Sequence, residues 1–228
     1  MIILSAVTGA MDAMSFLGLG RVFTSVMTAN MVFLGISAGK RDATLALHVG
    51  TVLVIFVGTT LIGARLLAEP RPGDPHPIWP RRVSVALAVE SIVLVAVTVG
   101  WEIVAARPHG AAQYLLLAGA AAVMGIQGAA IRSLGVTGLS TTYLTGLFTT
   151  VLTGIVRKDD PDFRRRGLLI LLALVLGAAG GSALFVEAPG LLPVLPLVLL
   201  AGVIGAVLLR SQGDWKQQQE RTCGSEWS

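Results

Sequence analysis

The sequence predicts an all-α protein: a polytopic helical bundle in a membrane, with two inverted repeats, about six full spans and two interrupted or re-entrant segments. The 228-residue chain is 54% hydrophobic and only 13% charged, with a mean hydropathy of +0.78, whereas soluble domains carry roughly one quarter charged residues. Several apolar runs reach the roughly 18 to 20 residues that cross a bilayer as a helix. Finally, matching polar and charged stretches recur in the two halves of the chain.

The first span is expected to begin near residue 2. The stretch IILSAVTGAMDAMSFLGLG follows Met1 without the basic region or the small-residue cleavage site of a signal peptide. Nearly uncharged runs then follow at Ala43 to Ala64, Val83 to Gly100, Tyr114 to Ile131, Leu168 to Val186 and Leu191 to Leu209. We interpret each of them as a membrane helix.

Two further segments, Val22 to Gly39 and Leu139 to Val156, are short and broken by hydroxyls and glycines. Backbone groups freed there need partners inside the protein or in a wet cavity. If both segments cross fully, the Lys and Arg residues divide 11 to 6 between the two sides. If both are re-entrant they divide 13 to 4, which the positive-inside rule favours. Both termini and the loop 69–82 are then expected in the cytoplasm.

An internal repeat explains why polar stretches interrupt both halves. Laying Thr24 on Thr141 also places Ser25 on Thr142, Thr28 on Thr145 and the Lys-Arg-Asp of 40–42 on the Arg-Lys-Asp of 157–159. Hydrophobicity alone would not align these charges. We therefore expect a first repeat over 1–113, a second over 114–210 and a polar tail over 211–228. With three full spans each, the two repeats would be inverted relative to one another, as in many transporters.

The stretches GAMDAMSFLGLGRVFTSVMTANMVFLG and, later, GIQGAAIRSLG and STTYLTG resemble the YoaK-like family of bacterial integral membrane proteins, which is labelled by a domain of unknown function. The resemblance covers nearly the whole chain. Two positions depart from the family pattern: Ala29 stands where Gly is expected, and Gly128 stands where Asn is expected. The resemblance implies a membrane protein and brings no established substrate.

The interrupted segments supply most of the candidate substrate-binding residues. We expect a solute to contact Asp12, Thr24, Thr28, Asn30, Gln127, Thr141, Thr142 and Thr145. Gln127 falls in the part of the second repeat that matches Asp12 in the first, so an amide and a carboxylate could form an asymmetric site. The alternative for Gln127 is a hydrogen bond between helices.

Three ionisable residues inside apolar runs are candidates for proton or ion coupling: Asp12, His48 and Glu90. Charged groups at membrane depth are costly, so they mark functional sites by default. Histidine also titrates near neutral pH. For Asp12 and His48 the alternative is a position near the membrane surface, within reach of water.

Other classes of function find little support. The only cysteine, Cys223, lies in the polar tail, and no zinc, haem, P-loop, HExxH or Ser-His-Asp pattern occurs, so we expect neither metal, cofactor nor enzyme activity. Basic residues flank the apolar runs, so nucleic acid is not an expected partner. We expect a small-solute transporter or channel of the bacterial inner membrane. A non-transporting scaffold or assembly factor, or an intramembrane enzyme, is the alternative. The expected partners are the lipid bilayer and an unidentified solute, with a homo-oligomer left open.

Overall fold

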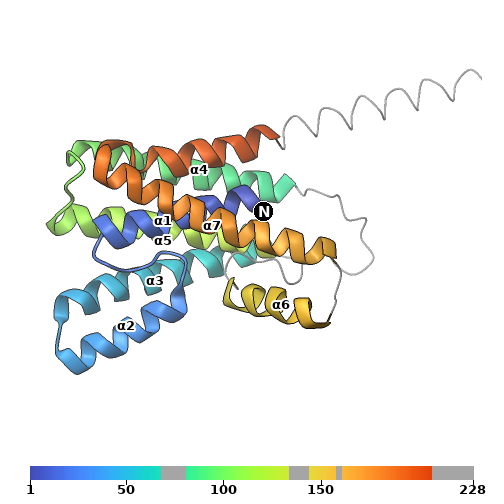
Figure 1. The fold of residues 1–228 in the computed structure, drawn as a ribbon. Helices are drawn as coiled ribbons and strands as arrows, with labels where there is room; N and C mark the ends of the chain where they lie inside the picture. The colour runs from blue at the N-terminus through green and yellow to red at the C-terminus, as the bar shows by residue number, and fades with distance from the viewer. Residues whose placement is uncertain (68–80, 134–143, 158–160, 207–228) are drawn as a thin grey trace, which may run out of the picture.

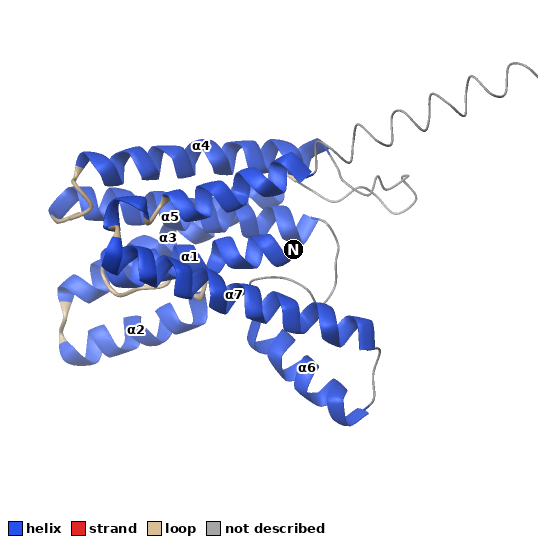
Figure 2. Cartoon of the chain, turned by 45° about the horizontal axis from the view of Figure 1, so that its top comes forward, coloured by secondary structure: helices blue, strands red, loops and turns tan. Residues whose placement is uncertain are grey.

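The computed structural model describes residues 1–67, 81–133, 144–157 and 161–206, and every regular element in them is a helix. Figures 1 and 2 show a helical bundle with no strand in these ranges. The elements are α1 (Ile2–Gly18), α2 (Met27–Lys40), α3 (Ala43–Leu66), α4 (Arg81–Ile103), α5 (Gly110–Ser133), α6 (Leu144–Arg157), α7 (Pro161–Glu187), the short 3-10 turn η2 (Pro189–Leu191) and a last helical segment, 194–206.

Five helices of the described part are long and apolar enough to cross a membrane: α3, α4, α5, α7 and the stretch Pro189–Ala206. The remaining expected span, α1, is a shorter apolar helix of 17 residues. Its length is about 26 Å at 1.5 Å per residue. Large apolar side chains such as Val54, Ile92 and Leu176 are more than two-thirds exposed on the outside of the bundle. Such a surface suits lipid tails.

The centre of the bundle is formed by α1 and α5. Of the five longer helices, α5 is by far the most enclosed, with 61% of its apolar window buried against 22 to 28% for the others. Almost every residue of α1 from Leu4 to Ser15 is also buried. The remaining long helices surround this pair, so that Thr8 and Asp12 of α1 and Gln127 of α5 are buried in protein.

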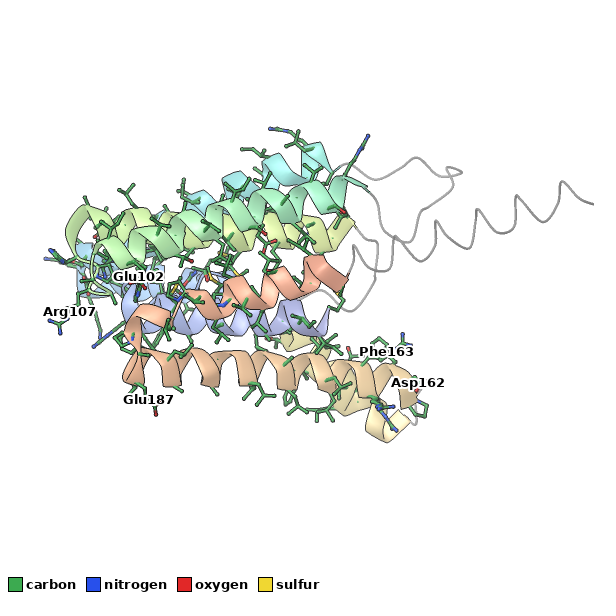
Figure 3. All side chains as sticks on the ribbon, turned by 90° about the horizontal axis from the view of Figure 1, so that it is seen from above. Glu102, Arg107, Asp162, Phe163 and Glu187 are labelled. Atoms are coloured by element: carbon green, nitrogen blue, oxygen red, sulfur yellow. The ribbon has the colours of Figure 1, made fainter. Side chains whose placement is uncertain are left out.

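The helix directions divide the bundle into two ends. In Figure 1, α1, α4 and α7 run one way, and α3, α5 and the segment 194–206 run the other way. We call the end that carries Met1 and the first residues of α4 and α7 the Met1 end. The opposite end, with Gly18, Ile103 and Gly110, is the Lys40 end. Figure 3 places Glu102, Arg107 and Glu187 at the Lys40 end and Asp162 at the Met1 end.

The short helices α2 and α6 each occupy only part of the bundle length. After α1 reaches the Lys40 end, residues 19–26 lead back toward the middle, and α2 then returns to the same end (Figure 1). Positive φ angles at Gly20 (113°) and Arg21 (60°) make this reversal. A left-handed Arg41 ends α2, and the Asp42 side chain caps α3 by accepting from the Leu45 N–H at 3.0 Å. Residues 19–40 thus leave from and return to the same end of the bundle, and we call them the re-entrant segment.

Two pairs of parallel helices pack unusually closely. In the pair α1 and α7, a Cβ on Gly9 would collide with the backbone of Leu174 and Ala178, and a Cβ on Gly177 would collide with the backbone of Ala6. In the pair α3 and α5, a Cβ on Gly125 would collide with Thr59 and with the Phe56 carbonyl. Small residues let helix backbones approach closely where apolar burial gives little drive inside a membrane.

Candidate functional site

The loop 19–26 is tied to α1 by the carboxylate of Asp12. Oδ1 accepts hydrogen bonds from the backbone N–H groups of Thr24 (2.8 Å) and Ser25 (2.9 Å) and from the Thr24 hydroxyl (3.2 Å). Oδ2 accepts from the Ser25 hydroxyl at 2.5 Å. All three side chains are buried. The carboxylate therefore satisfies backbone donors of the re-entrant loop, and its charge lies just ahead of the N-terminus of α2, where the helix dipole favours an anion.

Asn30, on the first turn of α2, holds the same loop from the other side. Its Oδ1 accepts from the Phe23 N–H at 3.1 Å, and its Nδ2 donates to the Phe23 carbonyl at 2.5 Å. The Phe23 ring stacks between Phe16 of α1 and Phe33 of α2. Asn30 is fully buried. The amide thus replaces the missing backbone partners that an interrupted membrane segment requires.

Gln127 connects the two central helices. Its Nε2 donates to the Leu4 carbonyl at 3.2 Å and to the Thr8 hydroxyl at 3.1 Å, so it joins α5 to α1. The side chain is 1% exposed. Its Oε1 is buried, with no hydrogen-bond partner among the described residues. The hydrogen bond between helices, which was the alternative interpretation of Gln127, is present, and the amide oxygen Oε1 has no partner among the described residues.

His48 lies near the start of α3, close to the Lys40 end. Its Nδ1 is 2.7 Å from the Thr44 carbonyl, and its ring stands 4.5 Å from the ring of Tyr114. A Cβ on Gly20 would collide with the imidazole, so the turn of the re-entrant loop rests directly on His48. The buried Nε2 has no hydrogen-bond partner in the described part of the chain.

Glu90 is the most unusual ionisable group of the described structure. It lies within α4 and is 0% exposed, and neither of its carboxylate oxygens has a hydrogen-bond partner among the described residues. Burying an unpaired charge is far more costly than burying a neutral polar group. Glu90 therefore differs from Asp12, whose two oxygens are both hydrogen-bonded.

The remaining candidates divide between surface positions and residues that the structure does not describe. Thr28 and Thr145 are exposed on the first turns of α2 and α6. Thr141 and Thr142 lie outside the described residues. In the described ranges, no group of three His, Cys, Asp or Glu side chains could hold a metal ion.

The candidates thus form separate clusters. Asp12 and Thr24 join in one, Asn30 braces the same loop through Phe23, and Gln127 binds Thr8 on the neighbouring helix. Sequence reasoning aligned Ser25 with the second repeat but did not name Ser25, Phe23 or Thr8 as site residues. Of these three residues, Ser25 could have been predicted from the sequence, because it is a second hydroxyl next to Thr24 in the same apolar segment.

This fold and these interior polar groups define a multi-pass helical membrane protein with a braced re-entrant segment. The family described as "Protein of unknown function (DUF1275)" matches residues 1–209, and the chain belongs to that family. The chain is also 28% identical over 220 residues to the UPF0700 transmembrane protein YoaK of Bacillus subtilis (strain 168), a match that covers 93% of this chain and 94% of that protein. No solved structure matches it. The resemblance seen in the sequence is confirmed.

Proposed function

We propose that the protein is a small-solute transporter or channel of the bacterial inner membrane, built from two inverted repeats with a pathway at α2 and α6. The supporting observation is a pair of equivalent helix contacts. Gly9 of α1 packs on Leu174 and Ala178 of α7, and Gly125 of α5 packs on Phe56 and Thr59 of α3. Within the two repeats, Gly9 aligns with Gly125 at an offset of 116 residues, and Gly58 of α3 aligns with Gly177 of α7 at an offset of 119. The first helix of each repeat therefore packs on the third helix of the other repeat.

The directions of the helices fit an inverted arrangement. In Figure 1, α1 and α5 run in opposite directions, as do α2 and α6, and α3 and α7. In an inverted arrangement, the basic residues that the repeat aligns should lie at opposite ends of the bundle. Lys40 ends α2 at one end, and Arg157 ends α6 toward the other end. Inverted repeats with broken helices near the midplane are a common construction of secondary transporters.

The two half-helices give the pathway its proposed position. Both begin near the middle of the bundle, and in Figures 1 and 2 their N-terminal ends face one another on the same side of α3 and α7. Thr28 and Thr145 are exposed there. Hydroxyls at such ends can bind a polar solute, while Asp12 and Asn30 keep the loop in place.

The proposed topology places the Met1 end in the cytoplasm. Among the residues that the structure describes, four basic residues belong to the Lys40 end: Arg21, Lys40, Arg41 and Arg107. Those of α5, α6 and the start of α7 lie toward the Met1 end, including Arg132, Arg164, Arg165 and Arg166. An excess of Lys and Arg marks the cytoplasmic side.

One observation favours the scaffold alternative. The polar atoms of Asp12 and Asn30 are partnered within the chain itself, which packing alone would require. Solute flux distinguishes the two functions. Purified protein is first screened for thermal stabilisation by a panel of small metabolites, because a ligand at a hundredfold its Kd stabilises by about 2.7 kcal/mol. Hits are then tested for uptake into proteoliposomes against empty liposomes. Stabilisation with uptake supports transport, and the absence of uptake for every hit contradicts it.

A further inference from the structure

The interior of the bundle holds two polar side chains, Glu90 and Gln127, with acceptor atoms that lack hydrogen-bond partners among the described residues. Glu90 of α4 is 0% exposed and Gln127 of α5 is 1% exposed. Both carboxylate oxygens of Glu90 and the Oε1 of Gln127 are buried without a hydrogen-bond partner among the described residues. Buried polar atoms are nearly always hydrogen-bonded, so three such acceptors in one part of the core need an explanation.

The packing of α4 on α5 brings these groups to the same depth. A Cβ on Gly119 would meet Val97, and a Cβ on Gly100 would meet Leu116. The two helices are therefore antiparallel, and moving along α4 toward its start corresponds to moving along α5 toward its end. Two turns from Val97 lead to Glu90, and two turns from Gly119 lead to Ile126, the residue before Gln127.

Within the described part of the chain, no basic residue of α4, α5 or the segment 194–206 lies within one helical turn of the depth of Glu90. The segment 194–206 contains no titratable residue, and the only charged residue of α5 is Arg132, more than a turn beyond Gln127 toward the Met1 end. On α4 itself, Arg82 lies two turns before Glu90. The carboxylate of Asp12 is hydrogen-bonded to the loop 19–26, and His48 lies near the Lys40 end of the bundle. A carboxylate here would be an unpaired buried charge, whereas a protonated carboxyl has an O–H that an amide oxygen can accept.

We propose that Glu90 is a proton-binding site in the bundle interior, protonated in the arrangement seen here and paired with Gln127 Oε1. Binding forms one O–H bond on a carboxylate oxygen, with the proton taken from water at one membrane surface. Releasing the proton leaves a charge that must reach water, so loss of the proton favours separation of α4 from α5. If the chain transports a solute as proposed above, this site makes the proton its coupling ion.

Infrared spectroscopy of the full-length protein in lipid tests the protonation without any solute. A protonated carboxyl gives its own C=O stretching band, which shifts on exchange into D2O. We expect this band at neutral pH in the native protein and its loss in Glu90→Gln, a neutral substitution of nearly the same shape. Glu102→Gln is the matched control, because Glu102 lies on the same helix but is exposed at the Lys40 end. Absence of the band from the native protein, or its persistence in Glu90→Gln, would overturn the proposal.

Gln127→Leu tests the pairing, since it removes the acceptor but leaves Glu90 in place. We expect the carboxyl band to remain and to shift to higher frequency as its hydrogen bond is lost. An unshifted band contradicts the pairing. In proteoliposomes, Glu90→Gln should abolish uptake driven by a pH gradient and retain exchange of solute across the membrane. Failure of all transport with an intact carboxyl band would refute the proposed function and leave the proton site standing.

Discussion

The Ser25 hydroxyl and backbone N–H both donate to the carboxylate of Asp12, so a single acidic side chain on α1 fixes the loop that precedes α2. This pairing changes the meaning of an acid inside an apolar helix. On insertion scales a charged residue at the helix centre costs about 2.5 to 3.5 kcal/mol. Four hydrogen bonds from Thr24 and Ser25 offset that cost while they close the re-entrant segment.

Removing the carboxylate should loosen the loop. Asp12→Ala leaves the buried N–H groups of Thr24 and Ser25 without an acceptor, and each such loss costs about 1 to 3 kcal/mol. Asp12→Asn keeps one carbonyl oxygen in place and should be much milder. Thermal unfolding in detergent measures both.

Asp42→Ala serves as the comparison for Asp12→Ala. Asp42 is exposed and caps α3 through Leu45 alone, so its loss should cost only about 0.5 to 2 kcal/mol. If Asp12→Ala were no more harmful than Asp42→Ala, the loop would not depend on Asp12.

Asp12→Asn also tests ion coupling. If the variant folds but loses pH- or ion-dependent uptake, the negative charge of Asp12 is required for transport and not only for stability.

The two close helix contacts should respond alike to an added methyl group. Gly9→Ala places a Cβ against the backbone of Leu174, and Gly125→Ala places one against the Thr59 hydroxyl and the Phe56 carbonyl. Overpacking of this kind costs about 1 to 3 kcal/mol. Gly58→Ala is the control, because no described atom outside its own helix lies within 4 Å of a Cβ there. Melting temperatures should fall for the first two and hold or rise for the control. Unequal responses at Gly9 and Gly125 would argue against equivalent contacts.

The proposed topology predicts opposite labelling at the two ends of the bundle. In a Cys223→Ser background, a cysteine at the exposed His109 of the Lys40 end should react in intact cells with a reagent that cannot cross the membrane. Cysteines at Gly73 and Ser211, which lie outside the described residues, should react only after the membrane is opened. Labelling of either of these in intact cells would contradict the six-span arrangement.

The half-helices should be close enough to cross-link. With Cys223 replaced by serine, cysteines at Thr28 and Thr145 should be joined by a short bifunctional reagent, because the N-terminal ends of α2 and α6 face one another (Figure 2). Where the purified protein takes up a solute, the cross-link should block uptake. A pair at Gly35 and Thr145, which moves only the α2 partner by two turns, should react more slowly. Equal reaction of both pairs would refute the shared position.

The class of protein followed from the sequence because hydropathy and charge are read along the chain. A bilayer requires long apolar runs whatever their tertiary neighbours are, so α3, α4, α5, α7 and the last span were visible in advance. The interruption near Thr24 was visible for the same reason, since hydroxyls and glycines in an apolar segment weaken it locally.

The partners of the polar side chains were decided only by the tertiary structure. Asp12, Gln127 and Glu90 are similar in sequence terms, each a lone polar group in an apolar run, yet the first is saturated by a loop, the second joins two helices and the third has no partner among the described residues. The difference depends on which helix lies opposite and in which register. Close contacts at residues such as Gly9 and Gly125 set that register. They join segments that are far apart in the chain, so the local sequence around each glycine does not indicate which helix packs against it.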